Sequence, residues 1–117
     1  MQSMRAQELA MLADAQVLYL TTTGRRSGLP RTIEIWFTYH AGRLYLNAER
    51  CFAAQWVQNV VQEPLVRVRL KDCEFAGQAR VLDPHRDRVV WHTVVALSRQ
   101  KYDWGEGLPV EITPLYG

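Results

Sequence analysis

The alternation of apolar and polar positions is clearest over residues 18–47, which read LYLTTTGRRSGLPRTIEIWFTYHAGRLYLN. Three apolar runs of period two are joined there by two turn signals. Because successive side chains of a strand point to opposite faces, this pattern predicts a three-stranded antiparallel meander. Its strands are expected at 16–22, 31–39 and 44–48, and residues 40–43 form the second hairpin turn.

The middle strand of this meander has two different faces. One face carries the apolar and aromatic side chains Ile33, Ile35, Phe37 and Tyr39. The other face mixes polar and aromatic side chains, namely Thr32, Glu34, Trp36, Thr38 and His40. Such a mixed face favours contact with a ligand or a partner subunit over contact with bulk water.

Helical spacing of apolar residues marks two further segments. A short amphipathic helix is predicted over roughly 4–14, with Ser3 as its N-cap. A second helix is predicted over 52–62, where apolar residues recur three and four positions apart, and Pro64 stops it.

The C-terminal half returns to strands. Alternation predicts strands at 65–70 and 74–82. Asp83-Pro84 predicts the start of a helix with Pro at its first position, fraying over 98–101. A last strand is expected at 108–115.

About six antiparallel strands with two or three helices at the connections indicate an α+β, mainly β fold. A small barrel fits such a chain, because closure removes exposed strand edges. The sequence has no internal repeat, linker or low-complexity segment, so one domain is expected over residues 1–117. No GxGxxG motif follows a predicted strand, which argues against a Rossmann fold.

Composition excludes several functional classes. The formal net charge is only +2 and the arginines are spread along the chain, which argues against a nucleic-acid-binding protein. Cys51 and Cys73 lack CxxC spacing, so reduced thiols are expected rather than a disulfide or a zinc site. The first residues lack the apolar core of a signal peptide, and no run approaches the ~20 apolar residues of a membrane span. We therefore expect a cytoplasmic location.

The first turn of the meander, residues 23–30, is the strongest candidate site. Two glycines permit positive φ there, and Arg25, Arg26 and Arg31 bring three cations to one short segment. Freed backbone N–H groups and guanidinium groups together bind phosphate or carboxylate well. A merely solvated charged turn is an equally good interpretation at this point.

Motifs for protein-based catalysis are sparse. His40, His85 and His92 do not have the spacing of a metal site, and Ser27 lies outside a nucleophile elbow. Glu34 is either a buried acid or the partner of an arginine such as Arg67. We therefore expect a bound cofactor to carry any chemistry.

Three segments resemble the deazaflavin-dependent nitroreductase family. They are TTTGRRSGLPR at 21–31, AAQWVQNVVQEP at 53–64 and FAGQARV at 75–81, and the similarity extends from about residue 17 to 115. That family belongs to the split β-barrel flavoproteins related to pyridoxamine phosphate oxidase. The resemblance implies a split-barrel fold of the FMN-binding type and a homodimer with cofactor sites at the subunit interface.

The resemblance also implies the identity of the cofactor. Members that bind flavin mononucleotide (FMN) start the second helix with a Ser-Arg-Lys cluster, whereas this chain has Ala54-Gln55-Trp56. Trp56 and Asn59 match the deazaflavin branch instead. These features favour coenzyme F420, whose long anionic tail suits the turn residues Arg25, Arg26, Ser27 and Arg31.

The remaining implied site residues surround the redox ring. The ring is expected against Ile35, Trp36 and Asn47, and Arg50 replaces the cation that the family places after the third strand. Tyr102 occupies the position of tyrosines over the substrate, which makes it the catalytic-site candidate, and Trp104 either shares that pocket or packs against the last strand.

The resulting hypothesis is an F420-dependent oxidoreductase that transfers a hydride to a small quinone, enone or nitro-type acceptor. One alternative is an FMN-binding split-barrel oxidoreductase or flavin carrier. Another is a non-enzymatic split-barrel dimer in which Trp36, Trp56 and Tyr102 fill an interface.

Overall fold

A computed structural model describes residues 6–116 of the chain. Its elements, in order, are α1 (Ala6–Met11), β1 (Leu18–Thr23), β2 (Pro30–Ile35), β3 (Thr38–His40), β4 (Arg43–Ala48), the 3₁₀ helix η1 (Cys51–Ala53), α2 (Gln55–Gln62), β5 (Leu65–Leu70), β6 (Cys73–Val81), α3 (Arg88–Tyr102) and β7 (Leu108–Pro114). The predicted cap Ser3 lies outside the described residues. The mainly β fold predicted from the sequence is confirmed.

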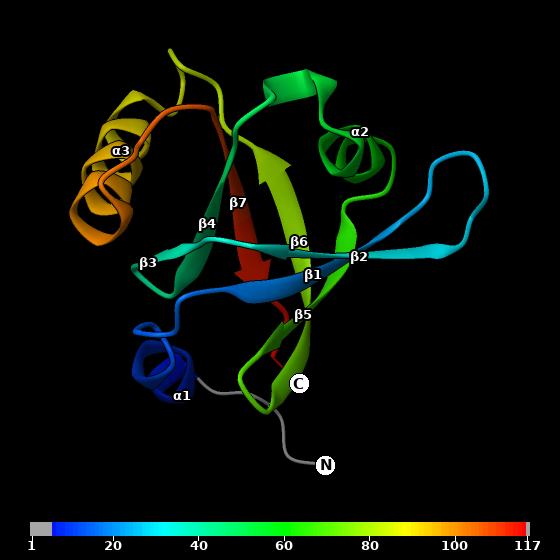
Figure 1. The fold of residues 1–117 in the computed structure, drawn as a ribbon, viewed down its shortest axis with the longest axis horizontal. Helices are drawn as coiled ribbons and strands as arrows, with labels where there is room; N and C mark the ends of the chain where they lie inside the picture. Colours follow the sequence, from blue (N-terminus) through cyan, green and yellow to red (C-terminus); the bar gives the residue numbers. More distant parts are fainter. Residues whose placement is uncertain (1–5, 117) are drawn as a thin grey trace.

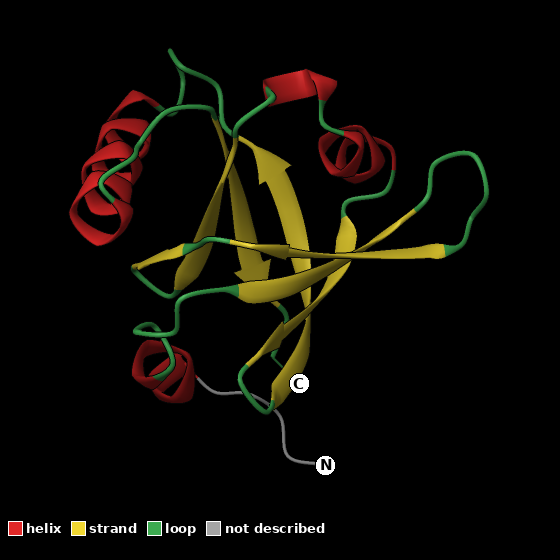
Figure 2. Cartoon of the chain, viewed as in Figure 1, coloured by secondary structure: helices red, strands yellow, loops and turns green. Residues whose placement is uncertain are grey.

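The described strands form one antiparallel sheet with the order β2-β1-β5-β6-β7-β4-β3. The sheet is strongly curved, with α2 at one end, where it contacts β1 and β6, α1 near the opposite end, and α3 at one side (Figures 1 and 2). The two edge strands β2 and β3 are consecutive in sequence, so residues 30–40 cross from one edge of the sheet to the other. This crossing gives the half-barrel its shape.

Apolar side chains from every side fill the interior of the curved sheet. They include Leu18, Leu20, Leu44, Leu46, Val66, Val68, Val110 and Ile112 from the strands, with Leu9 from α1 and Val57 and Val60 from α2. Alternation is regular in β5, where Val66, Val68 and Leu70 are buried and the residues between them are exposed. Burying such side chains is the main stabilising contribution, at about 1.5–3 kcal/mol for each large one.

The single middle strand predicted at 31–39 is wrong. The chain leaves the sheet at Trp36 and Phe37, so that β2 pairs with β1 whereas β3 pairs with β4. Phe37 and Thr38 are both buried, which breaks the expected alternation of faces. The second hairpin turn is confirmed, with positive φ at Ala41 (51°) and Gly42 (83°).

The predicted bounds of the last helix are also wrong. Residues 84–87 form a turn, and α3 begins at Arg88. Asp83 holds that turn, because its carboxylate accepts hydrogen bonds from the N–H groups of His85 (2.9 Å) and Arg86 (2.8 Å). The helix then continues to Tyr102 instead of fraying over 98–101.

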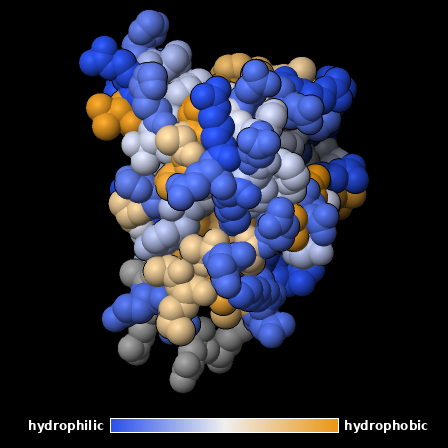
Figure 3. Space-filling view, turned by 60° about the vertical axis from the view of Figure 1, so that its left-hand side comes forward, coloured by the Kyte–Doolittle hydropathy of each residue, from blue (hydrophilic) through white to orange (hydrophobic). Residues whose placement is uncertain are grey.

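The surface is mostly hydrophilic on the face shown in Figure 3, with small apolar areas between polar side chains. None of the helices over residues 6–116 is long and apolar enough to cross a membrane. The same residues contain no cluster of three or more side chains suited to a metal ion.

Candidate functional site

The turn between β1 and β2 is a compact loop that carries Arg25 and Arg26, and Arg31 follows at the start of β2. The Gly24 N–H donates to the Leu29 carbonyl and the Gly28 N–H to the Gly24 carbonyl, both at 2.8 Å. Gly28 has a φ of 72°, which favours glycine. Among the described residues, the N–H groups of Arg26 and Ser27 have no hydrogen-bond acceptor. These two N–H groups remain available to a ligand.

Asn59 fastens this loop to α2. Its Oδ1 accepts a hydrogen bond from the Arg25 N–H at 3.2 Å and another from the Arg25 guanidinium at 3.0 Å. Its Nδ2 donates to the Thr22 hydroxyl at 3.2 Å, and the residue is only 4% exposed. The amide is therefore occupied by protein groups, so Asn59 positions the loop.

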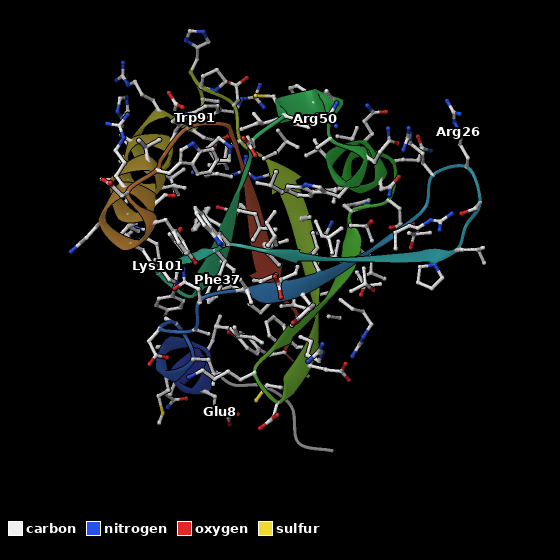
Figure 4. All side chains as sticks on the ribbon, in the orientation of Figure 1. Glu8, Arg26, Phe37, Arg50, Trp91 and Lys101 are labelled. Carbon is white, nitrogen blue, oxygen red and sulfur yellow. The ribbon has the colours of Figure 1, made fainter. Side chains whose placement is uncertain are left out.

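The loop and α2 enclose a cavity of about 430 Å³, which we call the arginine compartment. Its lining includes Arg25, Arg26, Ser27, Arg31, Ile33, Gln55, Trp56 and Asn59. Arg26 lies at the tip of the loop (Figure 4) and lines this compartment. The structure thus brings the three predicted arginines and Ser27 together around one cavity.

A second cavity of about 710 Å³, the aromatic compartment, adjoins the first. The two share the lining residues Ile33, Gln55 and Trp56, so they lie next to each other along β2 and the start of α2, and we call them together the groove. The aromatic compartment is also lined by Glu34, Ile35, Trp36, Asn47, Glu49, Arg50 and Trp104. All ten residues predicted to bind the cofactor line this groove.

Asn47 brings an unsatisfied side-chain amide to the wall of the aromatic compartment. Both polar atoms of its side chain, Oδ1 and Nδ2, are buried and have no hydrogen-bond partner among the described residues. A buried amide without partners costs roughly 1–3 kcal/mol for each unsatisfied group. Asn47 also lines a small cavity with Thr38, whose hydroxyl likewise has no partner within residues 6–116, so an ordered water there can satisfy the amide as well as a ligand can.

Tyr102 does not line either compartment. Its ring is stacked against Trp36, with centroids 4.4 Å apart and planes 4° apart. Its hydroxyl accepts from the Phe37 N–H at 3.0 Å and lies 2.8 Å from the carbonyl oxygens of Gln16 and Phe37. Burial raises the pKa of this hydroxyl. Tyr102 therefore lies behind the wall of the groove that Trp36 forms.

Glu34 is neither a buried acid nor the partner of an arginine, the two environments considered for it from the sequence. Its side chain is exposed and accepts a hydrogen bond from the Tyr19 hydroxyl at 2.9 Å. No ion pair joins Glu34 to Arg67 or another cation within residues 6–116. It is a surface residue at the edge of the aromatic compartment.

Lys101 is a site residue that the sequence analysis missed. Its Nζ donates to the carbonyl oxygens of Phe37 (3.0 Å) and Ala13 (3.1 Å), and burial lowers its pKa to about 8. Figure 4 shows it beside Phe37, at the corner between β2 and β3. A lysine in the last turn of a helix has no sequence signal for such a role, because its partners lie more than 60 residues away.

Solved structures share this fold. The F420-H2 dependent reductase FDR-A is 25% identical, with a TM-score of 0.60 over 83% of this chain and 92% of that chain. A protein from Listeria innocua, described as a candidate pyridoxamine 5′-phosphate oxidase, is 20% identical, with a TM-score of 0.66 over 92% and 90% of the two chains. The conserved hypothetical protein Rv2991 from Mycobacterium tuberculosis is 18% identical, with a TM-score of 0.76 over 95% and 81%.

No curated protein significantly matches the sequence. The resemblance to deazaflavin-dependent split barrels is nevertheless confirmed, because a family model covers nearly the whole chain. That model, described as F420H(2)-dependent quinone reductase, matches residues 1–113. The chain therefore belongs to the F420H(2)-dependent quinone reductase family, and it is an F420-dependent oxidoreductase with a split-barrel fold.

Proposed function

We propose that this protein uses reduced F420 to transfer a hydride to a small planar acceptor, of which a quinone is the leading candidate and an enone or nitro compound an alternative. The observation that carries the proposal is the groove, which places a cationic loop next to an aromatic compartment. F420 has an anionic tail and a polar ring edge, so the two ends of the groove fit the two ends of this molecule.

The arginine compartment supplies the donors that an anionic tail requires. Arg26 and Arg31 are exposed there and form no ion pair within residues 6–116. The free N–H groups of Arg26 and Ser27 add backbone donors to the same cavity wall. Guanidinium groups bind phosphate and carboxylate oxygens in a bidentate manner, which favours this loop as the tail site.

The aromatic compartment supplies orientation and exclusion of water. Ile35, Trp36 and Trp56 provide apolar walls, and Asn47, whose amide has no protein partner among the described residues, lines the same compartment. When bound, reduced F420 supplies the hydride. The chain contributes a fixed orientation of the reactants, and we assign no proton transfer to any side chain.

Asn59 and Tyr102 were expected to contact the cofactor or the substrate directly, but we assign them positioning roles. Asn59 is assigned to positioning the arginine loop, because Arg25 and Thr22 already occupy its amide. Tyr102 is assigned to positioning Trp36, because backbone groups already occupy its hydroxyl. Arg50 is exposed at the rim of the aromatic compartment and is retained as a cofactor-binding candidate.

The proposal includes a homodimer, as the family resemblance implies, and a cytoplasmic location, as expected from the sequence. Support comes from large apolar side chains that are exposed in the single chain, among them Phe52 (57%), Val61 (62%) and Leu65 (52%). A second copy that covered them would remove this apolar area from water. Light scattering coupled to size-exclusion chromatography measures the oligomeric state directly.

The decisive experiment is a fluorescence titration of the purified protein with F420 and with FMN at matched ionic strength, followed by an assay of F420H2 oxidation with a soluble naphthoquinone. We expect saturable F420 binding, weaker FMN binding and quinone-dependent oxidation. Preferential FMN binding, with yellow colour retained through dialysis, would support the flavin alternative. A stable dimer that binds neither ring system would support a non-enzymatic role.

A further inference from the structure

The corner between β2 and β3 is where the backbone crosses between the edges of the sheet. At this corner Phe37 lies outside both strands, so its N–H and carbonyl lack partners in the sheet. Two side chains from the end of α3 replace those partners. The Tyr102 hydroxyl contacts both groups, at 3.0 Å and 2.8 Å, and Lys101 Nζ donates to the carbonyl at 3.0 Å.

The same two side chains reach the segment between α1 and β1. Lys101 donates to the Ala13 carbonyl at 3.1 Å, and the Tyr102 hydroxyl lies 2.8 Å from the Gln16 carbonyl. The Lys101 ammonium also lies 3.8 Å from the centre of the Phe37 ring, within the range of a cation–π contact. The end of α3 therefore joins two separate parts of the chain, the Phe37 corner and residues 13–16.

This junction lies directly behind Trp36. The indole is stacked on Tyr102 and meets Trp104 edge to face, at 6.3 Å and 72°. Trp36 is nevertheless 43% exposed, and it lines the aromatic compartment. Its position in the groove is thus determined by the backbone at Phe37 and by the ring of Tyr102.

A lysine is an unusual residue for a buried contact that only stabilises the fold. The nearest carboxylate on the adjoining segment, Asp14, is paired with Lys71 at 3.0 Å. Lys101 instead makes hydrogen bonds to two carbonyl oxygens, and burying its charge opposes the protonated form. A group that is costly to bury but makes directed hydrogen bonds at a corner is suited to fixing geometry.

We propose that Lys101 and Tyr102 are positioning residues, which fix the Phe37 corner and so hold Trp36 as the wall of the aromatic compartment. The effect on Trp36 follows from the contacts in this chain alone. The expected effect on F420 binding rests on the proposed function. The two parts are therefore measured separately.

The first readout reports on Trp36 itself. Near-ultraviolet circular dichroism is recorded for each protein and for the same protein with Trp36→Phe, and the difference isolates the signal of Trp36. Lys101→Met is compared with Lys71→Met, because these are the two lysines of the chain and both contact residues 13–14. We expect Lys101→Met to lose most of the signal and Lys71→Met to retain it.

The second readout is the dissociation constant for oxidised F420. We expect Lys101→Met to raise the F420 dissociation constant by about fivefold, because Trp36 is held less firmly. This change matches the free energy of about one hydrogen bond. Lys71→Met is expected to match the parent protein. If the parent protein does not bind F420 while the Trp36 signal changes as expected, the proposed function fails and the positioning role stands.

The proposal is overturned if folded Lys101→Met retains the Trp36 signal. If that variant does not fold, Tyr102→Phe decides, because it keeps the stacked ring and removes only the hydroxyl from Phe37. A reduced Trp36 signal in Tyr102→Phe supports the positioning role, and an unchanged signal overturns it.

Discussion

Replacing Asn59 by alanine tests whether α2 holds the arginine loop in place. The substitution removes three hydrogen bonds at once: two from Arg25 to Oδ1, at 3.2 Å and 3.0 Å, and one from Nδ2 to Thr22 at 3.2 Å. Because Asn59 is only 4% exposed, water does not easily replace these bonds. The loop would then be anchored only by its own turn contacts.

The magnitude follows from the chemistry of the three bonds. A net hydrogen bond between neutral groups contributes about 1 kcal/mol, and one to a charged group about 1.5–3 kcal/mol. Arg25 is half-buried, so in Asn59→Ala its guanidinium regains part of its solvation, and this offsets part of the lost hydrogen bonding. We therefore expect the free energy of unfolding to fall by roughly 2–4 kcal/mol. A domain with the usual stability of about 5–15 kcal/mol remains folded after such a loss.

Urea denaturation measures this loss, and F420 titration of the folded variant measures the effect on the site. Gln58→Ala is the matched control, since Gln58 is the adjacent residue on α2 and its amide donates only to the exposed Phe52 carbonyl, at 2.9 Å. We expect that control to cost about 0.5 kcal/mol, as for an ordinary surface substitution. If Asn59→Ala costs no more than Gln58→Ala, the anchoring role is wrong.

Three further predictions concern charged and polar side chains in the groove and at the Phe37 corner behind it. Arg26→Ala should weaken F420 binding by ~1–3 kcal/mol in a titration, as for a lost charge-assisted hydrogen bond. The control Arg88→Ala on α3 should leave F420 binding unchanged. If Arg26→Ala binds F420 as tightly as the parent protein, the loop is not part of the site. Asn47→Leu should keep or raise the unfolding free energy, because it removes an unsatisfied amide, yet lower F420 affinity; a large loss of stability would mean that the amide is satisfied in the folded protein. Burial lowers the pKa of Lys101 from 10.5 to about 8, so above that pH the unfolded chain binds more protons than the folded chain and stability should rise with pH. Urea denaturation at about pH 8 and about pH 9.5 should show a smaller rise in Lys101→Met, and an identical rise would contradict the shifted pKa.

Regular local patterns gave accurate predictions for much of this fold. The strand predicted at 65–70 matches β5 at both ends, because its alternation reflects one buried and one exposed face. The predicted helix at 52–62 is divided into η1 and α2, and Cys51 adopts a positive φ of 52° at the start of η1. Apolar periodicity could not reveal this division, since it does not report the backbone geometry of a helix start.

The amino-acid sequence by itself determined which segments form strands, that three arginines gather on one glycine-containing loop, and that the chain belongs with deazaflavin-dependent split barrels. These properties depend on neighbours along the chain, so they are visible as local patterns and motifs. Only the tertiary structure decided that the strand predicted at 31–39 is divided between two sheet edges, that Tyr102 lies behind Trp36, and that Lys101 contacts the corner at Phe37. Those contacts join residues more than 60 positions apart, and closure of the sheet, rather than any local preference, brings them together.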